Sequence, residues 1–107
     1  MHRLGTFEQL LLLAVVRLGD DTYGVPIRAE IEARTGRAVS PGAIYTALDR
    51  LERRGLVRSA LGEPNACRGG KRKRLYRLTA SGAQTIAEVQ GQMAEMTRGL
   101  KPKLGLP

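Results

Sequence analysis

The amino-acid sequence predicts a mainly α-helical fold with one small antiparallel β-hairpin. Apolar residues recur at helical spacing in four stretches, each bounded by capping or turn residues. After Gly55 the apolar residues instead alternate with polar ones, in two short runs that are typical of strands. A connection rich in glycine and basic residues, at positions 62–73, separates these runs. With 107 residues, the chain is long enough for one domain with a modest core.

The first predicted helix starts near Thr6. Thr6 and Gln9 have the spacing of a capping box, and Gly19 is expected to end the helix. Apolar residues form its inward face and also occupy its other sides: Phe7, Leu10, Leu11, Ala14, Val15 and Leu18 face inward, and Leu12, Leu13 and Val16 lie elsewhere. Because a helix that is apolar nearly all round is buried on more than one side, we expect a partner subunit to cover part of it.

The second predicted helix covers residues 23–35. Turn and capping residues precede it at positions 20–22, Pro26 lies in its first turn and Gly36 follows it. Ile27 and Ile31 face inward. Residues 37–39 then form a short extended link to the next helix, so the two helices are expected to be a helix-turn-helix.

The third predicted helix, at residues 40–56, has both ends marked in the sequence. Ser40 can cap it, Pro41 suits its first position and Gly55 can stop it. One face is apolar and the other is polar: Ile44, Ala47, Leu48 and Leu51 form the first, and Tyr45, Thr46, Asp49, Arg50 and Arg53 the second. A polar set near a helix N-terminus can reach base edges in a major groove, which predicts a recognition helix.

The two alternating runs, residues 56–61 and 75–78, predict a hairpin. Its long tip would be the wing of a winged helix-turn-helix. Residues 50–77 hold ten of the 18 basic side chains and two of the ten acidic ones, and residues 68–77 hold six basic side chains and no acid. Charge confined to one segment favours a polyanion partner, although a nuclear-targeting or merely solvated patch is the alternative.

The last predicted helix begins after Thr79 and runs to about Arg98. Its apolar residues are spaced 3, 4, 3 and 4, as in the seam of a coiled coil: Ile86, Val89, Met93, Met96 and Leu100. We therefore expect a dimerisation helix, the alternative being that this stripe packs on its own domain. The predicted organisation is a winged helix-turn-helix domain at residues 1–79, the dimerisation helix at residues 80–100 and a flexible tail at residues 101–107.

The residue content argues against an enzyme. His2 is the only histidine and Cys67 the only cysteine, so the sequence offers no convincing catalytic pair, no metal-ligand spacing and no internal disulfide. The apolar run in the first helix is too short to span a bilayer. We expect a cytoplasmic protein without cofactor, metal or membrane attachment.

Short motifs stand in a fixed order between residues 23 and 86. They are Tyr23-Gly24, Ser40-Pro41-Gly42, Ile44-Tyr45, Leu48, Arg50-Leu51, Gly55-Leu56, Gly69-Gly70, Lys71, Lys73, Arg74, Tyr76-Arg77-Leu78-Thr79 and Gly82. Together they resemble the PadR family of winged helix-turn-helix transcriptional regulators, in its subgroup with a small C-terminal part. The resemblance implies a homodimer, held by the C-terminal helix against the N-terminal one, that binds a palindromic operator, usually as a repressor. Thr46 and Leu75 depart from the family pattern, which often has a proline and an aromatic residue there.

The expected function is therefore a sequence-specific DNA-binding regulator of transcription. The alternative is a winged helix that binds a protein or an RNA. The candidate DNA-binding residues are Ser40, Gly42, Tyr45, Thr46, Arg50, Arg68, Lys71, Arg72, Lys73 and Arg74. The candidate dimerisation residues are Phe7, Leu11, Ile86, Val89, Met93, Met96 and Leu100. The sequence leaves open whether a small-molecule effector binds. Members of the family that bind drugs hold flat ligands between tryptophans, and because this chain has no tryptophan we do not expect that activity of it.

Overall fold

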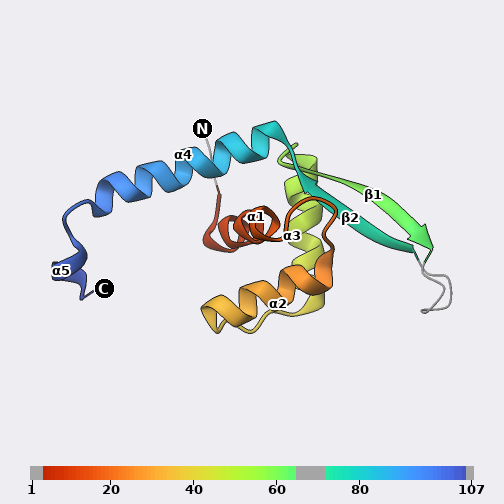
Figure 1. Ribbon diagram of the computed structural model, residues 1–107, viewed down its shortest axis with the longest axis horizontal. Helices are drawn as coiled ribbons and strands as arrows, with labels where there is room; N and C mark the ends of the chain where they lie inside the picture. Colours follow the sequence, from red (N-terminus) through yellow and green to blue (C-terminus); the bar gives the residue numbers. More distant parts are fainter. Residues whose placement is uncertain (1–3, 65–71, 106–107) are drawn as a thin grey trace.

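The structure is a computed structural model, and it describes residues 4–64 and 72–105. Its elements are α1 (Thr6–Leu18), α2 (Gly24–Thr35), α3 (Pro41–Arg53), β1 (Val57–Pro64), β2 (Arg72–Leu78), α4 (Ala80–Thr97) and α5 (Lys101–Leu104). The first three helices pack together, the hairpin extends from one side of them and α4 extends from the other (Figure 1). The predicted fold class, mainly helical with one antiparallel hairpin, is confirmed.

The hydrophobic core lies between α1, α2 and α3 and is closed by the base of the hairpin and the start of α4. Its buried members are Leu11, Leu12, Ala14, Val15, Ile27, Ile31, Val39, Ile44, Ala47, Leu48, Leu51, Leu56, Val57, Tyr76 and Ile86. Burying this many apolar side chains is the main source of stability available to so small a domain.

The first helix is capped differently from the sequence prediction. Gly5 is its N-cap residue, and the Glu8 carboxylate accepts the Gly5 N–H at 3.0 Å. Thr6 is already helical, and the Gln9 amide donates to the Leu4 carbonyl at 3.1 Å. The predicted capping box of Thr6 and Gln9 is therefore wrong by one residue, because Glu8 rather than Gln9 bonds back to the N-cap.

The sequence predicts that residues 20–22 cap α2, but in the structure they do not. The N-cap residue is Tyr23, which makes no side-chain capping bond. Thr22 instead forms a bridge with Tyr76 of β2, in which each backbone N–H donates to the other residue's carbonyl, at 3.2 and 2.6 Å. Asp21 accepts a bond from Arg77 at 3.0 Å. Asp21 and Thr22 therefore connect the turn before α2 to β2.

The third helix forms as predicted. The Ser40 hydroxyl accepts the Ala43 N–H at 3.1 Å, Pro41 is the first helical residue, and Gly55 adopts a left-handed φ of +76° just after the helix. Every residue of the predicted apolar stripe is buried. Local chemistry is thus enough to fix both ends and the orientation of α3.

The two strands pair antiparallel, with Val57 opposite Leu78 and Leu61 opposite Arg74. After an irregularity the pairing continues with Pro64 opposite Arg72. Both strands therefore extend further than predicted, into the connection that we expected at residues 62–73. Residues 65–71 lie outside the described residues.

The fourth helix starts at a tight junction with the base of the hairpin. The Thr79 hydroxyl accepts the Gly82 N–H at 2.9 Å and donates to the Gly55 carbonyl at 2.7 Å. Beyond Ile86 no side chain of α4 is buried. Within the segment expected as a tail, residues 101–104 form the short helix α5.

Candidate nucleic-acid interface

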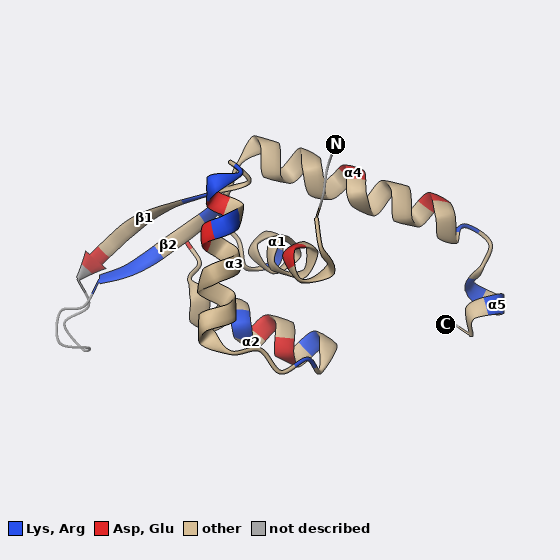
Figure 2. Ribbon diagram, turned by 180° about the vertical axis from the view of Figure 1, so that it is seen from behind, with Lys and Arg blue, Asp and Glu red and all other residues tan. Residues whose placement is uncertain are grey.

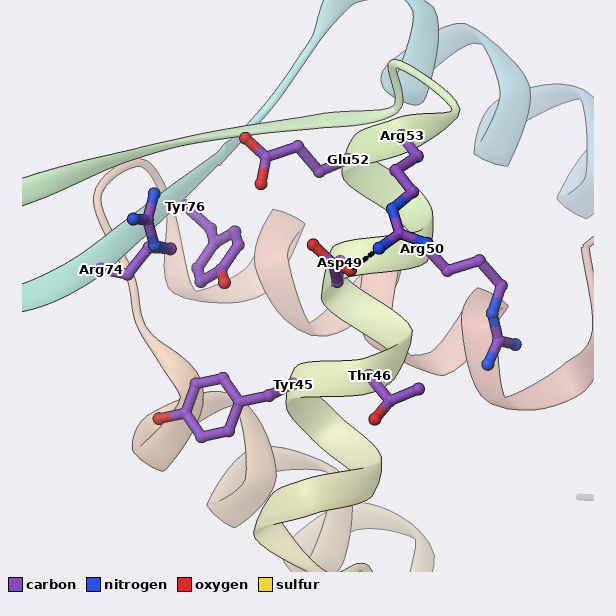
Figure 3. Close-up of a pocket in the computed structure, with 8 residues that line it drawn as sticks. All are labelled: Tyr45, Thr46, Asp49, Arg50, Glu52, Arg53, Arg74 and Tyr76. Atoms are coloured by element: carbon purple, nitrogen blue, oxygen red, sulfur yellow. Dashed lines mark ion pairs between the residues drawn. The ribbon is translucent and has the colours of Figure 1, made fainter.

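The exposed face of α3 and the adjoining face of β2 enclose an open groove of about 1020 Å³ (Figure 3). It is lined by Tyr45, Thr46, Asp49, Arg50, Glu52, Arg53, Arg74 and Tyr76. The structure thus brings Tyr45, Thr46, Arg50 and Arg74, four of the predicted DNA-binding residues, to one groove.

Tyr45 has one face on the groove and one on α2. Its side chain is 45% exposed. A Cβ atom on Gly24, the first residue of α2, would lie 2.6 Å from the Tyr45 Cζ and Oη atoms. The ring therefore lies directly over the α2 backbone, and glycine at position 24 leaves the space for it.

Three charged side chains follow one another along the exposed face of α3. Asp49 pairs with Arg53 at 2.8 Å, but both side chains are more than half exposed, so this pair adds little stability. Within the described residues, Arg50 has no ion-pair partner. Its five N–H donors suit bidentate bonds to a guanine edge or a phosphate.

Arg74 is tied back to α3 through β1. Its Nη1 atom lies 3.1 Å from the Ser59 hydroxyl oxygen, and that oxygen lies 2.8 Å from both carboxylate oxygens of Glu52. Beside them, Tyr76 is 4% exposed. Burial, reinforced by the Glu52 charge, raises the pKa of the Tyr76 phenol above its ordinary value, so this ring stays neutral.

Strand alternation divides the basic residues of β2 between two faces. Arg74 and, by alternation, Arg72 share the groove side, and Arg72 donates to the Gly62 carbonyl at 2.8 Å. On the other face the Lys73 ammonium lies 4.2 Å from the centre of the Tyr23 ring, and Arg77 pairs with Asp21. Lys73 was expected to bind DNA, but the structure does not bring it into the groove, because it packs on Tyr23.

The remaining predicted DNA-binding residues have other places. Ser40 is occupied as the N-cap of α3. Gly42 is exposed in the first turn of α3, with nothing within 4 Å of where a Cβ would be. Arg68 and Lys71 lie outside the described residues. Basic residues of the described part lie along β2 and at the end of α3, where acidic residues lie beside them, and also on α2 and α5 (Figure 2).

The predicted dimerisation residues separate into buried and exposed ones. Leu11 is 0% exposed and Ile86 5%, so both belong to the core of their own chain and have no surface to offer a partner. Met93 and Met96 are 55% and 76% exposed on α4. The half-buried residues of this set are Phe7, Val89 and Leu100. The Arg37 guanidinium lies 5.7 Å from the centre of the Phe7 ring.

Sequence reasoning missed Glu52 and Tyr76 as groove residues, and Ser59 as the residue that connects Glu52 to Arg74. A glutamate near the end of a helix and a serine in a strand are ordinary surface residues in a sequence, and their contact spans seven positions between two elements. No local pattern marks such a pair.

The described residues show neither a metal cluster nor a membrane span. Across residues 4–64 and 72–105, no group of three or more His, Cys, Asp or Glu side chains could hold a metal ion. No helix in the same ranges is both long and apolar enough to cross a membrane.

Helices α2 and α3, with the hairpin beside them, define a winged helix-turn-helix, a class in which the second helix of the pair reads DNA. The sequence profile of the PadR-like family of transcriptional regulators matches residues 12–88. The chain belongs to this family, and its function is therefore DNA-binding regulation of transcription. No curated protein matches the chain.

Solved structures with the same fold include PadR-like regulators from several bacteria. A PadR-like transcriptional regulator from Bacillus cereus is 20% identical with a TM-score of 0.74, over 94% of this chain and 92% of that one. A PadR-like transcription factor from Bacteroides fragilis is 21% identical with a TM-score of 0.75, over 90% and 87%. A PadR family regulator from Eggerthella lenta is 25% identical with a TM-score of 0.69, over 90% and 81%.

Proposed function

We propose that the protein is a cytoplasmic repressor that binds a palindromic DNA operator as a homodimer. The observation that carries this proposal is the groove between α3 and β2, in which polar and basic side chains from both elements meet (Figure 3). The protein then acts as a binding protein and not as an enzyme.

Sequence recognition is assigned to α3. Thr46 and Arg50 are exposed one turn apart, and Tyr45, which precedes them, also lines the groove while its ring lies over α2. With α3 in a major groove, Arg50 can donate two bonds to one guanine, and the methyl group of Thr46 can contact thymine. Arg72 and Arg74 of the hairpin would contact phosphates and fix the register of the helix.

Dimerisation is assigned to α4, with the exposed part of α1 against it. Met93 and Met96 are large apolar side chains on a helix that leaves its own domain, and Val16 of α1 is also 51% exposed. A second copy that covers these side chains would remove apolar surface from water. Two copies related by a two-fold axis require two half-sites, about one helical turn of DNA or a multiple of it apart.

The proposal is tested by selecting bound sequences from a random duplex pool at fixed salt. The selected DNA is expected to contain an inverted repeat. Thr46→Ala and Arg50→Ala should lower affinity for the selected site, by roughly 1–3 kcal/mol for a lost base contact, and much less for a scrambled duplex. Arg34→Ala is a matched control, because Arg34 pairs with Glu30 on α2 and does not line the groove.

Repression is tested by transcription in vitro from a template with the selected site placed over the promoter. The full-length transcript should decrease as the protein is added, and Arg50→Ala should need more protein. Equal affinity for selected and scrambled duplexes would contradict sequence recognition. Tighter binding to duplex RNA than to DNA would favour the RNA alternative, and an increase in transcript would exclude repression at that site.

A further inference from the structure

Ser59 lies on the edge strand β1 with its backbone N–H directed away from β2. Its partner in the register is Tyr76, whose own N–H and carbonyl are used by Thr22 on the opposite side. Ser59 and Tyr76 therefore form a non-hydrogen-bonded pair, and the Ser59 N–H needs an acceptor other than β2. Glu52 of α3 supplies it, with Oε2 at 3.1 Å.

The Ser59 hydroxyl then connects Glu52 to Arg74. A hydroxyl has one proton to donate and lone pairs with which to accept. The distances of 2.8 Å to the carboxylate and 3.1 Å to the guanidinium fit a hydroxyl that donates to Glu52 and accepts from Arg74. A carboxylate of the recognition helix thus holds a guanidinium of the hairpin through one serine.

This connection limits where the Arg74 side chain can be. Arg74 is exposed and lines the groove, and a free arginine would lose rotamer freedom when it binds DNA. A side chain that is already held over the groove loses less. We propose that Glu52 and Ser59 are positioning residues that hold the Arg74 guanidinium for contact with a DNA phosphate beside the major groove that α3 enters. This inference rests on the proposed DNA-binding function.

The informative variant is Ser59→Ala, because it removes the hydroxyl but keeps the backbone bond to Glu52 and the net charge. With the selected duplex, the dissociation rate should rise roughly threefold to tenfold while the association rate stays unchanged, since long-range attraction depends on charge. Ser59→Thr keeps a hydroxyl and should restore the parent rate. Ser81→Ala, on the exposed first turn of α4, is the matched control.

Arg74→Ala should raise the dissociation rate by about tenfold and lower the slope of log K against log salt by about 0.9 per subunit. The double variant Ser59→Ala/Arg74→Ala should bind no more weakly than Arg74→Ala alone, because Ser59 acts through Arg74. Additive losses would overturn the positioning role. Glu52→Gln keeps an oxygen for the Ser59 N–H but loses the charge. Its effect on the dissociation rate should also disappear when Arg74 is already replaced by alanine. An effect of the same size with and without Arg74 would overturn the inference.

The outcomes separate this inference from the proposed function. If Arg50→Ala weakens binding while Arg74→Ala and Ser59→Ala bind like the parent, the positioning role is overturned and the DNA-binding function stands. If the parent protein selects no duplex sequence, the proposed function itself is overturned. Thermal unfolding of each variant verifies that the compared proteins are folded.

Discussion

Replacing Gly82 with alanine tests the junction that joins α4 to the rest of the domain. A Cβ atom at this position would lie 2.0 Å from the Leu56 carbonyl oxygen and 2.9 Å from the Leu78 Cδ1 atom. The first of these is a backbone atom that cannot swing away, so α4 itself must shift. That shift would strain two bonds of Thr79, from its N–H to the Leu56 carbonyl and from its hydroxyl to the Gly55 carbonyl.

The expected loss follows from these contacts. Overpacking costs roughly 1–3 kcal/mol, and each weakened hydrogen bond costs about 1 kcal/mol. We therefore expect Gly82→Ala to lower the free energy of unfolding by about 3 kcal/mol, which corresponds to roughly 12–24 °C in Tm for a domain of this size. Thermal unfolding followed by circular dichroism, at one fixed protein concentration, measures it.

Gly91→Ala in the same helix is the matched control. Nothing lies within 4 Å of a Cβ atom at position 91, and the residue is exposed in the middle of α4. Replacing such a helical glycine with alanine should stabilise the protein by about 1 kcal/mol. The two variants should therefore move Tm in opposite directions; if Gly82→Ala matched or exceeded the parent Tm, the close packing at this junction would be refuted.

Four further predictions follow. Met93→Glu combined with Met96→Glu should give a folded monomer in sedimentation, and a dimer would contradict the assignment of α4. Ser40→Ala should lower the free energy of unfolding by about 1 kcal/mol through loss of the cap. Lys73→Ala should lower it by about 0.5–1 kcal/mol through loss of the Tyr23 contact, with little change in the salt dependence of DNA binding. The folded-state pKa of Tyr76 is raised, so the contribution of its neutral phenol to the free energy of unfolding is present below pH 10 and is lost as pH rises further. Tyr76→Phe should remove this pH dependence from the free energy of unfolding, measured by urea titrations across pH 9–11.

The third helix was predictable because everything that defines it is local. The cap at Ser40, the apolar stripe and the stop at Gly55 lie within one stretch and do not depend on what packs against it. The polar face, and hence Thr46 and Arg50 as groove residues, follows from the same periodicity. The start of α1 is also local, but Gly5 with Glu8 and Thr6 with Gln9 offered two adjacent starting points, and sequence spacing did not distinguish them.

Long-range contacts explain what the sequence did not predict. Periodicity identifies Leu11 and Ile86 as positions on an apolar helix face. It does not say whether residues of the same chain or of a partner subunit pack against that face. In the structure both are covered by their own domain. The bond from Ser59 to Glu52 likewise depends on how the edge of the hairpin meets α3, and that geometry exists only in the folded chain.

The basic run of the hairpin shows why a charge count alone overstates a DNA-binding surface. Of its described members, Arg72 and Arg74 lie on the groove side, whereas Lys73 and Arg77 are engaged by Tyr23 and Asp21 on the opposite face. Tyr23 and Asp21 belong to the turn that precedes α2, so two of the four cations contact the helix-turn-helix and not the groove. If each phosphate contact contributes about −0.9 to the salt slope, the described wing residues supply about −1.8 per subunit and not twice that value. The other two cations, Lys73 and Arg77, contact the turn before α2 and so lie on the face of β2 away from the groove between α3 and β2.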